Sequence, residues 1–285
     1  MLYINEKNCK KLFKKGSVIL VAAALGGVLL TGCGPTEIST NAGANYDVID
    51  TTSDESLERG ITQIKEVPGQ DFNLVIEYKC QLNEGERWVV TADKDINIEI
   101  RTDGLPEGVE VYIDNVHTDT TVRSYFPTVD GIMQDTMDDH VHNSLMMGFP
   151  IADDNAYSSI NHIEGQNDTF ISGFVHGYQG YSNGTIEEKR FKESDYLSTG
   201  VNANKISSVI DLIIVEGEQV TCTSVKSEVQ VSVWPFVQKI SSDGTIRYAY
   251  YTYNAKTGKM EEKSLTEEEY LLQTEVYNQR KIKEK

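Results

Sequence analysis

Residues 72–78 have the sequence Phe-Asn-Leu-Val-Ile-Glu-Tyr, a run of β-branched and aromatic residues that is typical of a β-strand. Similar runs follow at 87–90 (Arg-Trp-Val-Val), 96–100 (Ile-Asn-Ile-Glu-Ile) and 109–113 (Val-Glu-Val-Tyr-Ile), with partial alternation of apolar and polar residues. Asn, Asp, Gly and Pro residues typical of turns separate these runs. Short strands at this close spacing predict an antiparallel sandwich or barrel.

A second β-rich stretch follows at 206–215, 219–234 and 245–253, again with glycine-containing turns between the runs. The two stretches together predict one body over residues 61–253 that is mainly β. We expect an antiparallel sandwich, of which an immunoglobulin-like fold is one form. With 285 residues, the chain is long enough to bury a core without a disulfide scaffold.

Between the two stretches, residues 127–205 are rich in Asn, Asp, Gly, Tyr and His, and we interpret them as a loop-rich insertion or binding segment. The insertion is expected to begin with a helix over 130–147. Apolar residues there recur at every fourth position, as on one face of a helix. Asp130 can cap this helix and Gly148 can end it. The apolar positions are Met133, Met137, Val141 and Leu145.

The C-terminal residues 254–285 are predicted to form a peripheral helical tail. Thr266 and Glu269 have the spacing of a capping box, in which each side chain bonds the other residue's backbone N–H. Leu272 and Val276 give this helix only a narrow apolar stripe, which indicates a position at the edge of the body.

The N-terminus contains five lysines, then the uncharged stretch 17–30 (SVILVAAALGGVLL), then Leu30-Thr-Gly-Cys33. A basic flank before a short apolar core is typical of an export signal. The string ending at Cys33 resembles the lipobox of bacterial lipoprotein precursors. That resemblance implies that residues 1–32 are a signal peptide and that Cys33 carries a diacylglycerol. It also implies a location on the outer face of the cell membrane. The alternatives are an ordinary secreted protein and an uncleaved anchor.

Residues 33–60 follow as a polar stretch without apolar periodicity, which predicts a flexible tether after the lipidated cysteine. The formal net charge of the whole chain is −18. Removing residues 1–32 leaves 21 basic and 43 acidic residues, a net charge of −22. Nucleic acid is therefore not an expected partner, and the membrane contact must depend on the lipid, because anionic lipids repel such a body.

The sequence contains four cysteines and no CxxC pair. Cys9 and Cys33 belong to the signal. Cys80 and Cys222 remain, and in an oxidising location they can either form a disulfide between the two β-rich stretches or stay as buried thiols.

The most enzyme-like string is Asp138-Asp-His-Val-His142. On a strand, His140 and His142 would share a face and could hold a metal ion, whereas on the expected helix they point to opposite sides. Asp138 could still reach His142 on that helix, because they are four residues apart. All five histidines lie between residues 117 and 176, so three could converge in space. We favour structural or surface roles, and no metal is predicted.

Three further features of the sequence resemble functional sites: a set of aromatic residues, an acidic run and a carboxylate within an apolar run. Aromatic residues among amides and carboxylates are typical of a sugar or peptide groove. Asp93, Asp95, Asn97 and Glu99 imitate a calcium loop, but their alternation with isoleucines favours a strand. Asp211 interrupts the apolar run 209–215, which indicates either a pair with Lys or Arg or an acid with a raised pKa. The candidate groove residues are Tyr157, His176, Tyr178, Tyr181 and Tyr196.

No GxSxG, HExxH, SxxK, nucleotide-binding loop or dinucleotide fingerprint occurs, so we expect no cofactor. These patterns predict a membrane-anchored extracytoplasmic lipoprotein that acts as an interaction or ligand-binding module for a protein, peptide or glycan. One alternative is a cell-envelope hydrolase that uses His and Asp residues of the central segment. The other is the solute-binding lipoprotein of a transporter, although such receptors usually alternate strands with long helices.

Overall fold

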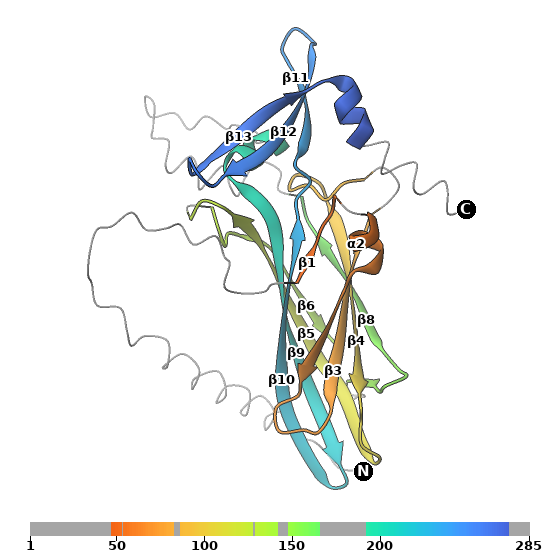
Figure 1. Ribbon diagram of the computed structural model, residues 1–285. Helices are drawn as coiled ribbons and strands as arrows, with labels where there is room; N and C mark the ends of the chain where they lie inside the picture. Colours follow the sequence, from red (N-terminus) through yellow and green to blue (C-terminus); the bar gives the residue numbers. More distant parts are fainter. Residues whose placement is uncertain are drawn as a thin grey trace, which may run out of the picture.

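The computed structural model describes residues 47–52, 54–82, 86–127, 129–141, 148–165 and 192–273, and within them the chain is mainly antiparallel β-structure. Three sheets are present (Figure 1). The long sheet has the order β1-β10-β9-β5-β6, with β7 also paired to β5. The short sheet has the order β2-β3-β4-β8, and the end sheet has the order β11-β12-β13. The expectation of a mainly β, sandwich-like fold is confirmed.

The long sheet consists of β1 (Val48–Ile49), β5 (Val109–Ser124), β6 (Met133–His140), β7 (Phe149–Ile151), β9 (Val201–Glu216) and β10 (Gln219–Ser232). The short sheet consists of β2 (Ile61–Glu66), β3 (Asn73–Gln81), β4 (Lys94–Asp103) and β8 (Tyr157–Ile163). The end sheet consists of β11 (Phe236–Ile240), β12 (Ile246–Asn254) and β13 (Lys259–Leu265). The named helices α2 (Asp54–Arg59) and α4 (Glu193–Ser198) are both short.

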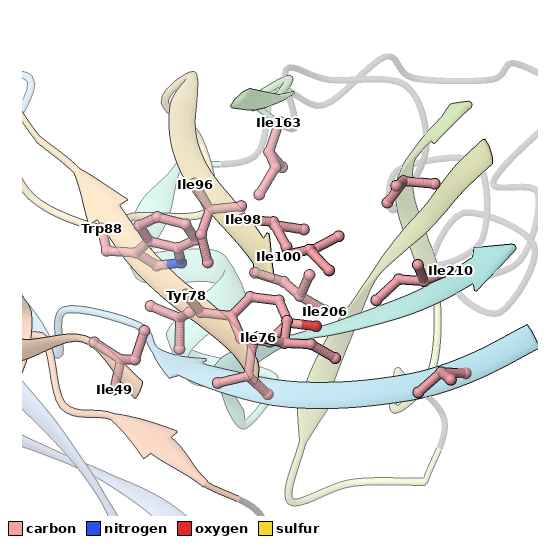
Figure 2. Packing of buried hydrophobic residues seen from close by; sticks show 14 of the residues in the cluster. Ile49, Ile76, Tyr78, Trp88, Ile96, Ile98, Ile100, Ile163, Ile206 and Ile210 are labelled. Atoms are coloured by element: carbon pink, nitrogen blue, oxygen red, sulfur yellow. The ribbon is translucent and has the colours of Figure 1, made fainter. Parts of the chain in front are cut away.

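The core lies between the long and short sheets. Along β4 every second residue is buried, so Ile96, Ile98 and Ile100 face inward while Asp95 and Asn97 stay on the outer face. The strand interpretation of this segment, rather than a calcium loop, is therefore confirmed. Isoleucines from both sheets gather around Tyr78 and Trp88, both fully buried (Figure 2). This single cluster provides most of the hydrophobic stabilisation, since each fully buried large side chain contributes about 1.5–3 kcal/mol.

Polar contacts close both open sides of the sandwich. On one side, Gln63 of β2 donates to the Glu228 carbonyl of β10 (2.7 Å) and accepts from the Ser227 hydroxyl (2.6 Å). On the other side, Asp139 of β6 accepts hydrogen bonds from the Tyr157 and Ser159 hydroxyls of β8. The edges of the two sheets are thus held together by paired polar groups, as buried groups require.

The helix predicted over 130–147 is wrong where the structure describes it, because Met133–His140 form β6. A spacing of four residues is an even number, so it keeps side chains on one face of a strand as well as on one face of a helix. Asp130 does not cap a helix. It lies in the β5–β6 turn, where it accepts the Ser124 N–H (3.0 Å) and pairs with Arg123 (3.0 Å). Leu145 lies outside the described residues.

Gly148 does not end a helix either; it begins the approach to β7. Its φ of +135° is a conformation that favours glycine, and a Cβ at this position would lie 2.2 Å from the Ile113 carbonyl oxygen. The central segment therefore supplies strands to both sheets (β6, β7 and β8) instead of forming a separate insertion.

One expected boundary moves. The folded part begins before residue 61, because Val48–Ile49 pair in parallel with β10 and Ile49 is fully buried.

The expected capping box near the C-terminus is confirmed: Glu269 accepts the Thr266 N–H (2.7 Å), and the Thr266 hydroxyl accepts the Glu269 N–H (3.2 Å). Residues 267–273 are helical.

Among the described helices, none has the length and apolar character needed to cross a bilayer.

Candidate functional site

Three residues singled out from the sequence lie on the outer face of the long sheet. Asn115 of β5 pairs with His140 of β6 on one side and with Asp211 of β9 on the other. Two residues further along β5, His117 pairs with Asp138. A register shift at Asp114 accompanies this row, and such bulges re-aim side chains. We call His117, Asp119, Asp138, His140 and Asp211 the outer polar cluster.

Carboxylates engage both ring nitrogens of His117. Its Nδ1 lies 2.6 Å from Asp138 and its Nε2 lies 3.2 Å from Asp119. The hydrogen bond with Asp138 is the main cause of a raised pKa at His117 and a lowered pKa at Asp138. Both ring nitrogens of His117 therefore already have a carboxylate partner, and this arrangement favours the protonated form of the ring over a general base that accepts a proton from a substrate.

Among the described residues, no Lys or Arg pairs with Asp211, which differs from the pairing favoured from the sequence. The apolar run alternates, so Ile210 and Leu212 are buried while Asp211 lies on the opposite face. The Ser224 hydroxyl donates to its carboxylate (2.7 Å). Burial is the main cause of a raised pKa at Asp211, and the nearby Asp114 carboxylate adds to it.

The other predicted residues are not brought into this cluster within the described part of the chain. His162 lies on the outer face of the short sheet, 2.7 Å from Asp95. Tyr157 and Tyr196 are buried rather than displayed in a groove, which corrects that interpretation. Outside the described residues lie Cys33, His142, His176, Tyr178 and Tyr181.

Among the described residues, no group of three or more His, Cys, Asp or Glu side chains has a geometry suited to a metal ion. Of the two alternatives left open for Cys80, a disulfide with Cys222 or a buried thiol, the structure shows a free thiol, and burial raises its pKa.

A different place has the form of a binding site. A cavity of about 800 Å³ lies where the end sheet meets the sandwich, and residues 236–241, all of β11 and the next residue, line it. Trp234, Phe236 and Tyr270 supply aromatic surface, and the Arg87 guanidinium lies 4.9 Å from the Trp234 ring centroid. Its volume falls within the roughly 300–1,000 Å³ of small-molecule sites. We call this the end cavity.

Buried contacts fix the wall of the end cavity opposite β11. The Trp88 indole N–H donates to Asn204 Oδ1 (2.9 Å), and both side chains are fully buried. Asn204 in turn donates to Gln134 Oε1 (2.7 Å). The chain beside Trp88 carries Arg87 and Val89 into the cavity lining, so this network anchors the wall.

A buried carboxylate and a buried ammonium brace the same segment. Glu193, at the start of α4, accepts the Val90 and Thr91 N–H groups (both 3.0 Å). The Lys94 ammonium donates to the carbonyls of Val89 (2.9 Å) and Ala92 (3.1 Å). Burial lowers the pKa of Lys94 to about 8, against the favourable charge of Glu193, and burial raises the pKa of Glu193.

Sequence reasoning missed the end cavity because it ended one β-rich run at Trp234 and began the next at Thr245. The available signal was the run Phe236-Val-Gln-Lys-Ile240 between Pro235 and the turn residues Ser241-Ser-Asp-Gly. The contacts of Glu193 with residues about a hundred positions earlier had no sequence signal.

No protein-family model matches the chain, and no curated protein matches it. Among solved structures, it is similar to a protein from Archaeoglobus fulgidus described only as "Crystal structure of protein from Archaeoglobus fulgidus". The sequence identity is 9%, and the TM-score is 0.28 over 60% of this chain and 98% of the other. A TM-score of 0.28 carries no inference about function.

Proposed function

We propose that the protein is a lipid-anchored extracytoplasmic binding module and that the end cavity is its ligand site. The end cavity is the observation that carries the proposal, because it combines a ligand-sized volume with aromatic side chains and cations. The string Leu30-Thr-Gly-Cys33 supports the anchor, since it resembles a lipobox. A lipid anchor followed by a tether would keep the module concentrated near the membrane without fixing its orientation.

The hydrolase alternative rests on the outer polar cluster and is less well supported. Asp138, His140 and Asp211 do share one face of the long sheet. Catalysis would require a base that can accept a proton, and both nitrogens of His117 already contact carboxylates. The solute-receptor alternative expects long helices between strands, whereas α2 and α4 contain six residues each.

The function is tested with the chain from residue 34 onward, which contains every described strand and helix. Arrays of glycans and peptides are screened, and binding is followed by tryptophan fluorescence because Trp234 lines the cavity. We expect Arg87→Ala to weaken binding at least tenfold and the matched variant Arg247→Ala, at an exposed position of β12, to leave it unchanged. Hydrolysis of a panel substrate that is lost in His140→Ala would contradict the proposal.

A further inference from the structure

Every residue of β11 and the following Ser241 line the end cavity, which identifies the part of the strand that faces it. Successive side chains of a strand point to opposite faces of the sheet. A cavity that touches six consecutive residues must therefore run along the edge of the strand. Among the described strands, β11 pairs only with β12, so no described strand covers its other edge, which faces this cavity.

The register shows which backbone groups lie at that edge. The Tyr251 N–H donates to the Pro235 carbonyl (3.0 Å), and the Ser241 N–H donates to the Thr245 carbonyl (2.9 Å). Hydrogen-bonded and non-bonded pairs alternate in an antiparallel ladder. Pro235 and Ser241 both belong to hydrogen-bonded pairs, and Gln238 lies three residues from each, so it belongs to a non-bonded pair. Its N–H and C=O therefore point away from β12.

Phe236 and Ile240 share this orientation, since they lie two residues to either side of Gln238. Within the described chain, no strand forms a hydrogen bond with the backbone N–H or C=O groups of these three residues. The cavity edge thus offers three N–H donors and three C=O acceptors in the alternating pattern of a strand that lacks its neighbour.

The side chains leave this edge unprotected. Proteins usually shield a free edge with charges, prolines or bulges. The single charged residue of β11, Lys239, is bonded to Glu262 (2.6 Å) and lies over the Tyr251 ring. Ile240 is 63% exposed, and its cross-strand neighbour Ile246 is 48% exposed. An apolar surface therefore adjoins the unpaired backbone groups.

The charged residues that line the cavity indicate which kind of partner it binds. Its two lining carboxylates are both engaged, because Glu193 binds the Val90 and Thr91 N–H groups and Asp195 accepts the Lys192 N–H (2.9 Å). The Lys192 ammonium, by contrast, has no ion pair among the described residues. A second copy would bring the same cations and a large negative net charge, and both oppose self-pairing.

We propose that the end cavity binds an extended polypeptide of another protein, which adds as a fourth strand to the end sheet beside β11. This inference rests on the proposed function and names its partner class. The peptide would alternate apolar side chains, which contact Phe236 and Ile240, with polar ones, and would place a carboxylate near Lys192. Main-chain hydrogen bonds would supply affinity, and the aromatic lining would supply specificity.

The test uses the full chain, purified in detergent, and a synthetic library of nine-residue peptides. Odd positions are randomised among Val, Ile, Tyr and Phe, and even positions among Ser, Thr and Glu. The tightest binder is then methylated at one backbone nitrogen at a time. We expect losses of at least tenfold at alternate positions only, because every second N–H would face β11.

The matched protein variants are Gln238→Pro and Gln238→Thr. Proline removes the edge N–H without removing a bond to β12, whereas threonine keeps that N–H. We expect a loss of at least tenfold in Gln238→Pro and less than twofold in Gln238→Thr. If Gln238→Pro does not fold, Ile240→Lys introduces an edge charge and is expected to weaken binding likewise.

Three outcomes would overturn the inference. The first is methylation losses without alternation. The second is a dimer that Gln238→Pro dissociates, which would make a second copy the occupant. The third is glycan binding that depends on Arg87 while the peptide library gives no binder; the proposed function would then stand without the strand-addition mode.

Discussion

Replacing Asn204 by leucine is expected to destabilise the protein by about 3 kcal/mol. Asn204 is fully buried and holds two hydrogen bonds, one from the Trp88 indole N–H and one to Gln134. Leucine has the same number and branching of side-chain heavy atoms, although its methyl groups are bulkier, and it cannot accept or donate a hydrogen bond. Each lost hydrogen bond removes about 1 kcal/mol, and a buried donor without an acceptor costs about 1–3 kcal/mol. The Gln134 amide is only half-buried, so water can partly replace its lost partner.

The measurement is thermal and urea unfolding of the chain from residue 34 onward, followed by circular dichroism. A loss of about 3 kcal/mol corresponds to a fall of roughly 6–12 °C in Tm for a body of this size. The matched control is Asn202→Leu, two residues earlier on β9, whose side-chain oxygen has no hydrogen-bond partner in the part of the chain that the structure describes. We expect this control to change the free energy of unfolding by less than about 1 kcal/mol.

A double-mutant cycle with Trp88→Phe isolates the hydrogen bond itself. Phenylalanine removes the indole N–H, so Asn204→Leu should cost about 2 kcal/mol less in the Trp88→Phe background than in the natural chain. A coupling energy below about 0.5 kcal/mol would refute the reasoning, because the Trp88–Asn204 bond would then not be the source of the loss.

The remaining predictions concern anchoring and pH. Cys33→Ser should abolish incorporation of labelled fatty acid and release the protein from membranes; labelling that persists would contradict the lipid assignment. The raised pKa of His117 means that its stabilising contribution is present below about pH 6.5 and is lost as pH rises through the folded-state pKa, so His117→Gln should destabilise more at pH 6 than at pH 9. Asp138→Asn should lower the pKa of His117 in an NMR titration. The pKa of Lys94 falls from 10.5 to about 8, so the unfolded chain binds more protons between these values and stability should rise with pH there; Lys94→Met should lack this rise.

The strands of the sandwich could be predicted from alternating apolar residues. In residues 96–100, for example, every second residue is apolar because only one face of the strand is buried. The same rule explains the error at β6. Met133 and Met137 are four residues apart, and that spacing is compatible with both a helix and a strand. Neither residue is fully buried, so no strong core signal favoured the strand. Asp211 was misjudged for a related reason, because a long apolar run hides which of its residues face outward.

The end cavity could not be predicted from local patterns, because four distant parts of the chain form it. The segment at Arg87 and Val89, the start of α4, residues 234–241 and Tyr270 meet only in the folded protein. Their junction depends on buried polar groups, and sequence periodicity cannot say which partners Glu193 or Asn204 will find. The run 236–240 was short enough to be taken for a connection between longer strands.

The two sides of the end cavity differ in a way that suits strand addition. The wall beside Arg87 is fixed by the buried Trp88–Asn204 bond and by the contacts of Glu193, so ordering it on binding would cost little entropy. The opposite side is a strand edge already in the extended conformation that a partner strand requires. A partner would therefore bear most of the ordering cost itself. Affinity should then depend more on how readily the peptide adopts an extended conformation than on any single side chain, which the alternating methylation pattern would reveal directly.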